Sequence, residues 1–131
     1  MKKTGVLNNQ LSQVIASMGH TDMLVVADAG LPVPPGVPCI DLAVTAGMPP
    51  FIPVVRALAT ELQAERLVIA EELHARGGTL STELQDCFPG ATLESVPHDQ
   101  LKALSARARA VVRTGECTPY SNVIICSGVT F

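Results

Sequence analysis

The sequence predicts an α/β protein, a single domain folded as a three-layer sandwich with a mostly parallel central sheet. Its 131 residues are the size of one ordinary domain. Several short apolar runs rich in Val and Ile have the length and composition of strands buried on both faces, as strands of parallel sheets are. Segments with helical periodicity separate these runs, and this alternation is typical of helices packed on both sides of such a sheet.

The first helix is expected within residues 7–18, because apolar side chains recur there at the spacing of one helix face. Asn8 or Asn9 is suited to capping its start, and Gly19 to ending it. His20 follows directly after this helix. The partial negative charge of a helix end favours the protonated imidazolium, so His20 is a candidate acid.

The remaining strands and helices alternate along the chain. Strands are expected at Met23–Ala27, Arg66–Ala70, Ala108–Val112 and Asn122–Cys126, with a weaker one at Cys39–Leu42. Helices are expected at Phe51–Ala64, Ser81–Phe88 and His98–Arg107. Prolines stiffen the loop after the first strand and the one before residue 51, which indicates rigid connections and no linker. We therefore expect residues 1–131 to form one domain.

Composition and charge argue against several classes of partner. The formal net charge is −3, and the nine Lys and Arg residues are scattered along the chain. With one Tyr, three Phe and no Trp, there is no aromatic platform for stacking bases. Nucleic acid and anionic membranes are therefore not expected as partners. The hydrophobic fraction of 47%, against 16% charged residues, instead indicates contacts between subunits.

No sequence feature indicates export, a membrane span or a metal centre. Polar residues interrupt the apolar core that a signal peptide needs, and no apolar run approaches the ~20 residues of a membrane helix, so a cytoplasmic location is expected. The four cysteines form no CxxC pair and lie far from the three histidines in sequence. We expect scattered, buried thiols and no zinc site.

Polar residues follow two predicted strands, and ligands of open α/β sheets bind beyond the carboxyl ends of strands. Asp28 ends the first apolar run, where an Asp is as typical of a turn as of a functional site. The polar segment 113–122 follows another strand and contains the only tyrosine. If the two strands are neighbours, Tyr120 and Asn122 face Asp28 across one pocket.

The signatures of common cofactors and hydrolases are missing. The chain has neither a GxGxxG fingerprint nor a P-loop, and neither a GxSxG elbow nor an HExxH pair. Acid/base chemistry by histidine on a small polar molecule needs no cofactor and stays open. His20 and His98 are the candidates, although a histidine beside a helix end also serves to bond free carbonyls or to meet solvent.

Four motifs give a more specific indication. They are GHTD at 19–22, ADAGLPVP at 27–34, VVRTGECTPYSN at 111–122 and the ending SGVTF at 127–131. Together with LNNQLSQVIASMGH at 7–20 and AEEL at 70–73, they closely resemble the ribose pyranase and fucose mutarotase family, and within it the ribose pyranase branch. The resemblance is loosest at 75–97, so His98 matches through the short string HDQLK alone.

The resemblance implies a cytoplasmic enzyme that interconverts the pyranose and furanose forms of free D-ribose without a cofactor, in support of ribose uptake and phosphorylation. It also implies a homo-oligomer, a decamer of two stacked pentameric rings, with pockets near subunit contacts. His20 matches the family's proton donor. The positions that match its sugar-binding residues are Asp28, His98, Tyr120, Ser121 and Asn122.

Opening a hemiacetal ring requires loss of a proton from the anomeric hydroxyl and delivery of another to the ring oxygen, which general acid/base groups perform. On this interpretation His20 is the proton donor, and Asp28 either orients His20 or binds a sugar hydroxyl. Two other functions are compatible with these residues. A non-catalytic sugar-binding partner of a ribose transporter would bind ribose without accelerating exchange. A phosphocarrier would use His20 as the phosphate acceptor, although no basic cluster surrounds it.

Overall fold

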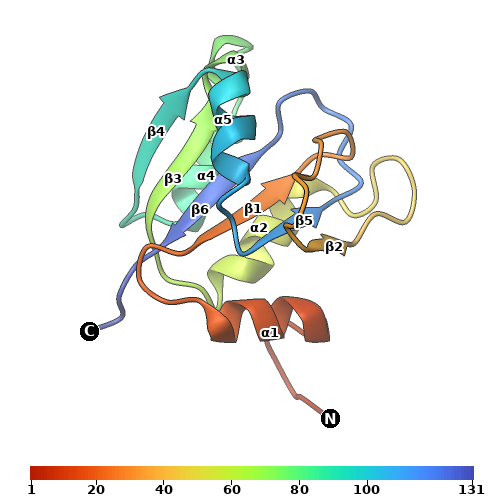
Figure 1. Ribbon diagram of the computed structural model, residues 1–131, viewed down its shortest axis with the longest axis vertical. Coiled ribbons are helices and arrows are strands. Elements are labelled where there is room, and N and C mark those ends of the chain that lie inside the picture. The colour runs from red at the N-terminus through yellow and green to blue at the C-terminus, as the bar shows by residue number, and fades with distance from the viewer.

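A six-stranded sheet forms the middle layer of the computed structural model, which describes residues 1–131 (Figure 1). The strands are β1 (Met23–Ala27), β2 (Cys39–Asp41), β3 (Ala64–Ala70), β4 (Thr92–Val96), β5 (Ala110–Arg113) and β6 (Val123–Ser127). Their order in the sheet is β2-β5-β1-β6-β3-β4. Only β6 runs antiparallel to its neighbours, β1 and β3. The predicted mostly parallel sheet is therefore confirmed.

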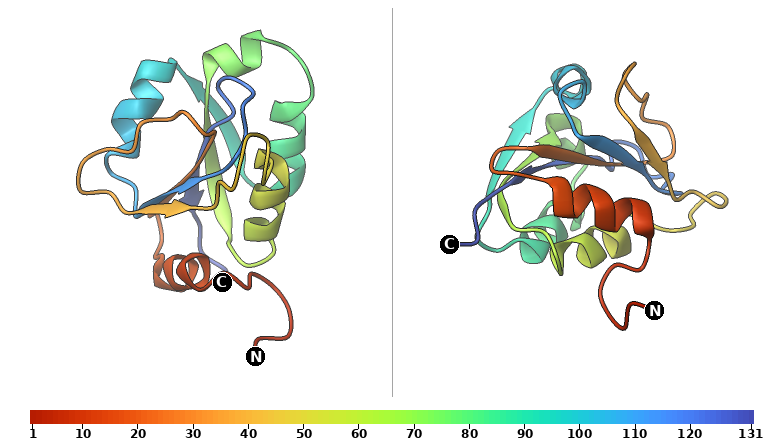
Figure 2. Two further views of the ribbon diagram at one scale, coloured as in Figure 1. Left: turned by 90° about the vertical axis from the view of Figure 1, so that its right-hand side faces the viewer. Right: turned by 60° about the horizontal axis from the view of Figure 1, so that its bottom comes forward.

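Helices cover both faces of this sheet, which completes the predicted three-layer sandwich. They are α1 (Asn9–Ser17), α2 (Phe51–Ala59), α3 (Glu71–Ala75), α4 (Leu80–Cys87) and α5 (His98–Ser105). Figure 2 shows α1, α2 and α4 on one face and α5 on the other. Every residue of β1 and β6 is consequently buried, which explains why both strands read as continuous apolar runs.

The ends of the strands define two opposite edges of the sheet. We call the edge where the five parallel strands end the carboxyl edge, and the edge where they begin the amino edge. The loop after β1 and the loop between β5 and β6 both lie at the carboxyl edge, where Figure 1 draws them side by side. Helix α1 and the segment that leads into β1 lie at the amino edge.

The predicted cap at the start of the first helix is confirmed, whereas the end of the helix differs from the prediction. The helix begins at Asn9, and the Asn8 side chain caps it by accepting the Leu11 N–H at 3.0 Å. Leu7 therefore lies outside the helix and is exposed. The helix ends at Ser17 with Met18 as an extended cap, so the prediction that Gly19 ends it is wrong. The left-handed residue that redirects the chain is Thr21, with φ 70°.

The second predicted helix, 51–64, was too long. Helix α2 stops at Ala59, where the Thr60 hydroxyl donates to the carbonyl of Ala57 at 2.7 Å, and β3 already begins at Ala64. The apolar residues after Ala59 are Leu62 and the start of the strand, both of them buried. Burial alone does not distinguish the end of a helix from the start of a strand.

Two elements were not predicted at all. Strand β4 lies at the sheet's outer edge, pairs only with β3, and buries only Val96 fully. An edge strand of this kind lacks the apolar run by which central strands are recognised. Helix α3 has five residues, of which only Leu73 is buried, so it is too short to show a helical period.

Candidate functional site

The centre of the carboxyl edge is a reciprocal pair formed by Asp28 and Asn122. The Asn122 amide nitrogen donates to Asp28 Oδ2 at 3.0 Å, and the Asp28 N–H donates to Asn122 Oδ1 at 2.9 Å. The pair forms because β1 and β6 are antiparallel neighbours, with Val26 opposite Val123, so the end of one strand meets the start of the other. Asn122 is fully buried, and its amide is thereby locked in one orientation.

A hollow of about 260 Å³ opens beside this pair. The residues that line it are Asp28, Gly30, Leu31, Pro32, His98, Lys102, Pro119 and Tyr120. The rings of His98 and Tyr120 meet edge to face, with centroids 5.1 Å apart and planes at 81°. His98 Nδ1 is buried and has no hydrogen-bond partner. The predicted proximity of Asp28, Tyr120 and Asn122 is confirmed, and His98 joins them.

Tyr120 reaches this position through a tight turn. Its φ is 64°, a left-handed conformation that is uncommon for a bulky residue. The Asn122 N–H donates to the Tyr120 carbonyl at 2.8 Å and closes the turn. Such a conformation persists only where the surrounding structure holds it, and it marks candidate functional sites.

Glu116 fastens the loop between β5 and β6 to the rest of the carboxyl edge. Its carboxylate accepts the Phe51 N–H at 3.1 Å and the Thr118 hydroxyl at 3.0 Å, and its carbonyl accepts the Ala29 N–H at 2.8 Å. Burial raises the pKa of the Glu116 carboxyl, but hydrogen bonds from Phe51 and Thr118 outweigh it and hold that pKa below its usual value. Glu116 therefore carries a charge that the loop itself stabilises.

Gly115 allows the same loop to pass close to the 44–49 turn. A Cβ at this position would overlap the backbone of Met48. The Gly115 N–H donates to the Pro49 carbonyl at 2.9 Å, and its own carbonyl accepts the Gly47 N–H. Only glycine permits this approach, so the loop is fixed by the 44–49 turn as well as by the contact of Glu116 with α2.

Lys102 is a lining residue that the sequence reasoning missed. It lies on α5 four residues after His98, and this spacing places both on one face of the helix. Its Nζ lies 2.7 Å from Asp99 Oδ1, and this hydrogen bond lowers the pKa of the Asp99 carboxyl. The i, i+4 relation to His98 was the signal that could have found it.

Ser121 is separated from the hollow that Asp28 and His98 share. Its hydroxyl is buried without a hydrogen-bond partner, and it lines a neighbouring hollow of about 260 Å³ between the loop and the turn at Arg76–Leu80. The sugar-binding role expected for Ser121 stays a prediction.

His20 lies at the opposite edge of the sheet. Its Nε2 is 2.9 Å from Glu65 Oε2, and both side chains are about half exposed, at 52% and 46%. The five residues of β1 alone separate it from Asp28 by about 16 Å. The alternative in which Asp28 orients His20 is therefore wrong within one chain. The predicted strand Met23–Ala27 between the two residues was the signal that could have shown this, because an extended strand keeps its two ends apart whatever its direction in the sheet.

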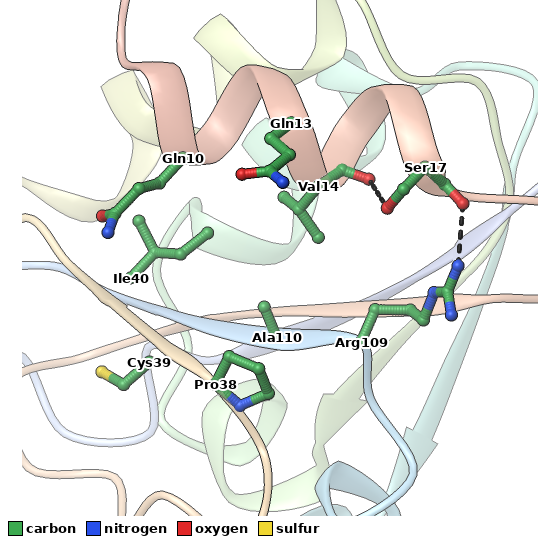
Figure 3. A pocket seen from close by; sticks show the side chains of 9 residues that line it. All are labelled: Gln10, Gln13, Val14, Ser17, Pro38, Cys39, Ile40, Arg109 and Ala110. Carbon is green, nitrogen blue, oxygen red and sulfur yellow. Dashed lines mark hydrogen bonds between the residues drawn. The ribbon is translucent and has the colours of Figure 1, made fainter.

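Another hollow, of about 340 Å³, lies at the amino edge between α1 and the starts of β2 and β5 (Figure 3). Arg109 closes one end by donating to the Ser17 carbonyl at 2.8 Å, as the dashed line in Figure 3 marks. Its remaining lining is amide, aliphatic and thiol groups, and it contains none of the predicted site residues. It therefore offers no acid/base pair.

The chemistry available at the candidate site is that of polar side chains. No group of three or more His, Cys, Asp or Glu residues is placed to hold a metal ion.

All four cysteines are free, and Cys39 and Cys117 are exposed, so the expectation of buried thiols is wrong for these two. None of the helices is both long and apolar enough to span a bilayer.

Comparison with known proteins gives consistent results over the whole chain. The sequence profile of the RbsD / FucU transport protein family matches residues 1–130. The chain is 52% identical to a D-ribose pyranase of Chloroflexus aggregans and 55% identical to one of Pseudomonas putida, and each comparison covers 100% of both chains.

Solved structures share the fold. A structure of Bacillus subtilis RbsD complexed with D-ribose is 44% identical, covers 100% of both chains and superposes with a TM-score of 0.95. A fucose mutarotase from Streptococcus pneumoniae in complex with L-fucose is 18% identical, with a TM-score of 0.79 over 95% of each chain. The second similarity concerns the fold alone.

Proposed function

We propose that this chain, which belongs to the RbsD / FucU transport protein family, is an isomerase that interconverts the pyranose and furanose forms of free D-ribose, and its anomers, without a cofactor. Relatives that are about half identical over their full length are named D-ribose pyranase. The observation that carries the proposal is the cluster of Asp28, His98 and Tyr120 around one hollow of about 260 Å³, with Asn122 hydrogen-bonded to Asp28. A hollow of this size suits a molecule smaller than most drug-sized ligands, such as a monosaccharide.

The cluster supplies complementary hydrogen-bonding groups for hydroxyls. The Asp28 carboxylate is an acceptor held in place by Asn122, and the Tyr120 hydroxyl is both donor and acceptor. His98 Nδ1 has no hydrogen-bond partner within the chain, and a sugar hydroxyl in the hollow would supply one. Lys102 adds a cation to the wall. A site built to pair with hydroxyls discriminates strongly against analogues that lack them.

In the proposed mechanism His20 donates its proton to the ring oxygen while solvent water takes the proton of the anomeric hydroxyl. The bond between the ring oxygen and the anomeric carbon breaks, and an open-chain aldehyde forms. A different hydroxyl then attacks the carbonyl carbon and gives its proton to the neutral His20, while water returns a proton to the carbonyl oxygen, which becomes the new anomeric hydroxyl. No atom is gained or lost overall. General acid/base catalysis of this kind contributes about 10²–10⁴-fold.

His20 acts, in this proposal, in the pocket of a neighbouring copy. It is exposed at the amino edge, whereas the hollow lies at the carboxyl edge of the same chain. A contact between the amino edge of one copy and the carboxyl edge of the next is heterologous, and such contacts form a ring where the rotation from copy to copy closes. The exposed apolar side chains of Leu7, Val44 and Phe131 favour contacts between copies. The decamer of two stacked pentamers and the cytoplasmic location remain predictions from the sequence.

Saturation-transfer NMR on D-ribose tests the proposal. Catalytic amounts of the chain should accelerate exchange between the pyranose and furanose signals, and His20→Ala should abolish the acceleration. His74→Ala, at an exposed histidine that lines neither the hollow of Asp28 nor that of Ser121, is the matched control and should leave exchange unchanged. Binding of ribose without faster exchange would instead identify a non-catalytic partner of a ribose transporter. The same measurement with fucose reports the sugar preference.

A further inference from the structure

Helix α3 contacts both sides of the candidate sugar pocket without lining it. The helix directly follows β3 at the carboxyl edge, where Figure 1 shows it at the end of the strand. Its Glu72 carboxylate accepts the His98 N–H, at 3.0 Å and 3.2 Å from its two oxygens. Arg76, the C-cap of the helix, donates from Nη1 to the Pro119 carbonyl at 2.6 Å. One short helix therefore connects the start of α5 with the loop that carries Tyr120.

Glu72 replaces a missing cap at the start of α5. The N-cap of α5 is Pro97, which makes no side-chain capping bond. The first N–H groups of a helix have no partner within the helix, and an anionic acceptor there is also favoured by the helix dipole. Glu72 supplies this acceptor from another part of the chain. Because His98 is the first residue of α5 and Lys102 lies one turn later, the position of this helix start places both in the hollow.

Arg76 holds the loop immediately before its strained residue. Pro119 precedes Tyr120, whose left-handed φ of 64° costs about 1 kcal/mol or more for a residue other than glycine. The Asn122 N–H restrains Tyr120 from one side of this turn. Arg76 restrains the peptide on the other side through the Pro119 carbonyl. Without it, the loop is free to relieve the strain by moving the Tyr120 ring away from His98.

We propose that Glu72 and Arg76 are positioning residues, which hold the His98 and Tyr120 rings in the edge-to-face arrangement that forms one wall of the sugar pocket. This role rests on the proposed function. Neither side chain lines the hollow of Asp28, so each acts through another residue. Glu72 acts through His98, and Arg76 acts through Tyr120.

Tyrosine fluorescence tests this placement in the absence of any sugar. Tyr120 is the only tyrosine and the chain has no tryptophan, so the emission reports on this ring alone. Glu72→Ala and Arg76→Ala should both increase quenching of the emission by acrylamide. Glu72→Gln and Arg76→Lys, which retain an acceptor and a donor, should restore most of the protection. Glu71→Ala, at the exposed neighbour on the same helix, is the matched control and should match wild type.

Ribose binding tests whether Glu72 acts through the start of α5, and Arg76 through Tyr120. Loss of either contact should weaken ribose binding about five-fold, the equivalent of one hydrogen bond. In a background that carries both His98→Ala and Lys102→Ala, Glu72→Ala should then change the dissociation constant less than about two-fold, and Arg76→Ala should behave likewise in a Tyr120→Ala background.

Two results would overturn the positioning role. One is quenching that stays at the wild-type value in both alanine variants, and the other is a full loss of affinity that persists in the background variants. If the wild-type chain neither binds ribose nor accelerates its exchange, the proposed function fails. The quenching data, which need no sugar, still decide on the positioning role in that case.

Discussion

The carboxyl edge and the amino edge of the same sheet differ in how firmly they hold their polar groups. At the carboxyl edge, Asp28 and Asn122 bond each other twice, and Glu116 ties the adjoining loop to α2. At the amino edge, the His20 side chain has Glu65 as its hydrogen-bond partner, and both are about half exposed. Groups that are buried and bonded at several points stay preorganised for a ligand, whereas an exposed pair exchanges readily with water.

In the proposed function this difference corresponds to separate tasks for the two edges. The carboxyl edge would bind the sugar with a fixed geometry, and the amino edge would present the exposed His20 to a neighbouring copy. A single chain would then offer half a site at each end of its sheet. The predictions below test this division, beginning with the largest expected effect.

Replacing His20 should remove catalysis and leave the fold intact. His20→Ala is expected to slow ribose exchange about 10²–10⁴-fold, because the proposed proton donor is lost. The free energy of unfolding should change by less than about 1 kcal/mol, since the exposed pair with Glu65 contributes little. Saturation-transfer NMR and chemical denaturation measure the two quantities. Unchanged exchange would refute the assignment of His20.

Mixing two inactive variants should restore activity if the site is shared between copies. Chains with His20→Ala and chains with Asp28→Asn, unfolded together and refolded at equal amounts, should regain about a quarter of wild-type exchange, the fraction of contacts that combine two intact halves. Mixed oligomers that form but remain inactive would place the whole site within one chain.

Asn122→Ala should weaken both the fold and ribose binding. It leaves the Asp28 carboxylate and N–H without their partner, which is expected to cost about 1–3 kcal/mol of unfolding free energy. Asn8→Ala is the matched control, because Asn8 caps α1 away from the pocket. It should cost about 1 kcal/mol and leave the ribose dissociation constant unchanged. Equal effects of Asn122→Ala and Asn8→Ala on the ribose dissociation constant would contradict a role of the Asp28–Asn122 pair in ribose binding.

Glu116 should make the loop at the carboxyl edge sensitive to acid. Its pKa in the folded chain is lowered from the usual 4.5, so its stabilising contribution is complete above about pH 4.5 and is lost as the pH falls through the lower folded value. Between pH 5 and 3, wild type should therefore lose more thermal stability than Glu116→Gln. Glu71→Gln serves as control and should follow wild type. If the thermal stability of Glu116→Gln falls with pH as steeply as that of wild type, the Glu116 carboxylate does not cause the acid sensitivity.

Glu65→Gln should have the smallest effect. The exposed pair with His20 is worth about 0–1 kcal/mol, so the melting temperature should hardly move. A large loss of stability would show that the amino edge is held more firmly than its exposure indicates. Thermal unfolding at low and high salt distinguishes the two cases, because an exposed ion pair weakens with ionic strength.

Much of this arrangement follows from local sequence signals. The buried strands β1 and β6 were predicted because helices cover both faces of the sheet and leave continuous apolar runs. Asn8 and the start of α5 were predicted from capping and periodicity, and the site residues from the matched motifs. Strand β4 and helix α3 escaped because an edge strand and a five-residue helix bury too little to leave a pattern.

The sequence by itself determined the fold class, the family and the kinds of side chain available for acid/base work on a sugar. Only the tertiary structure decided that His98, Tyr120 and Asn122 meet Asp28 at one edge of the sheet. The reason is that composition and periodicity report local burial. The direction and neighbours of a strand depend on pairings between distant segments, such as that of β1 with β6, which leave no local trace.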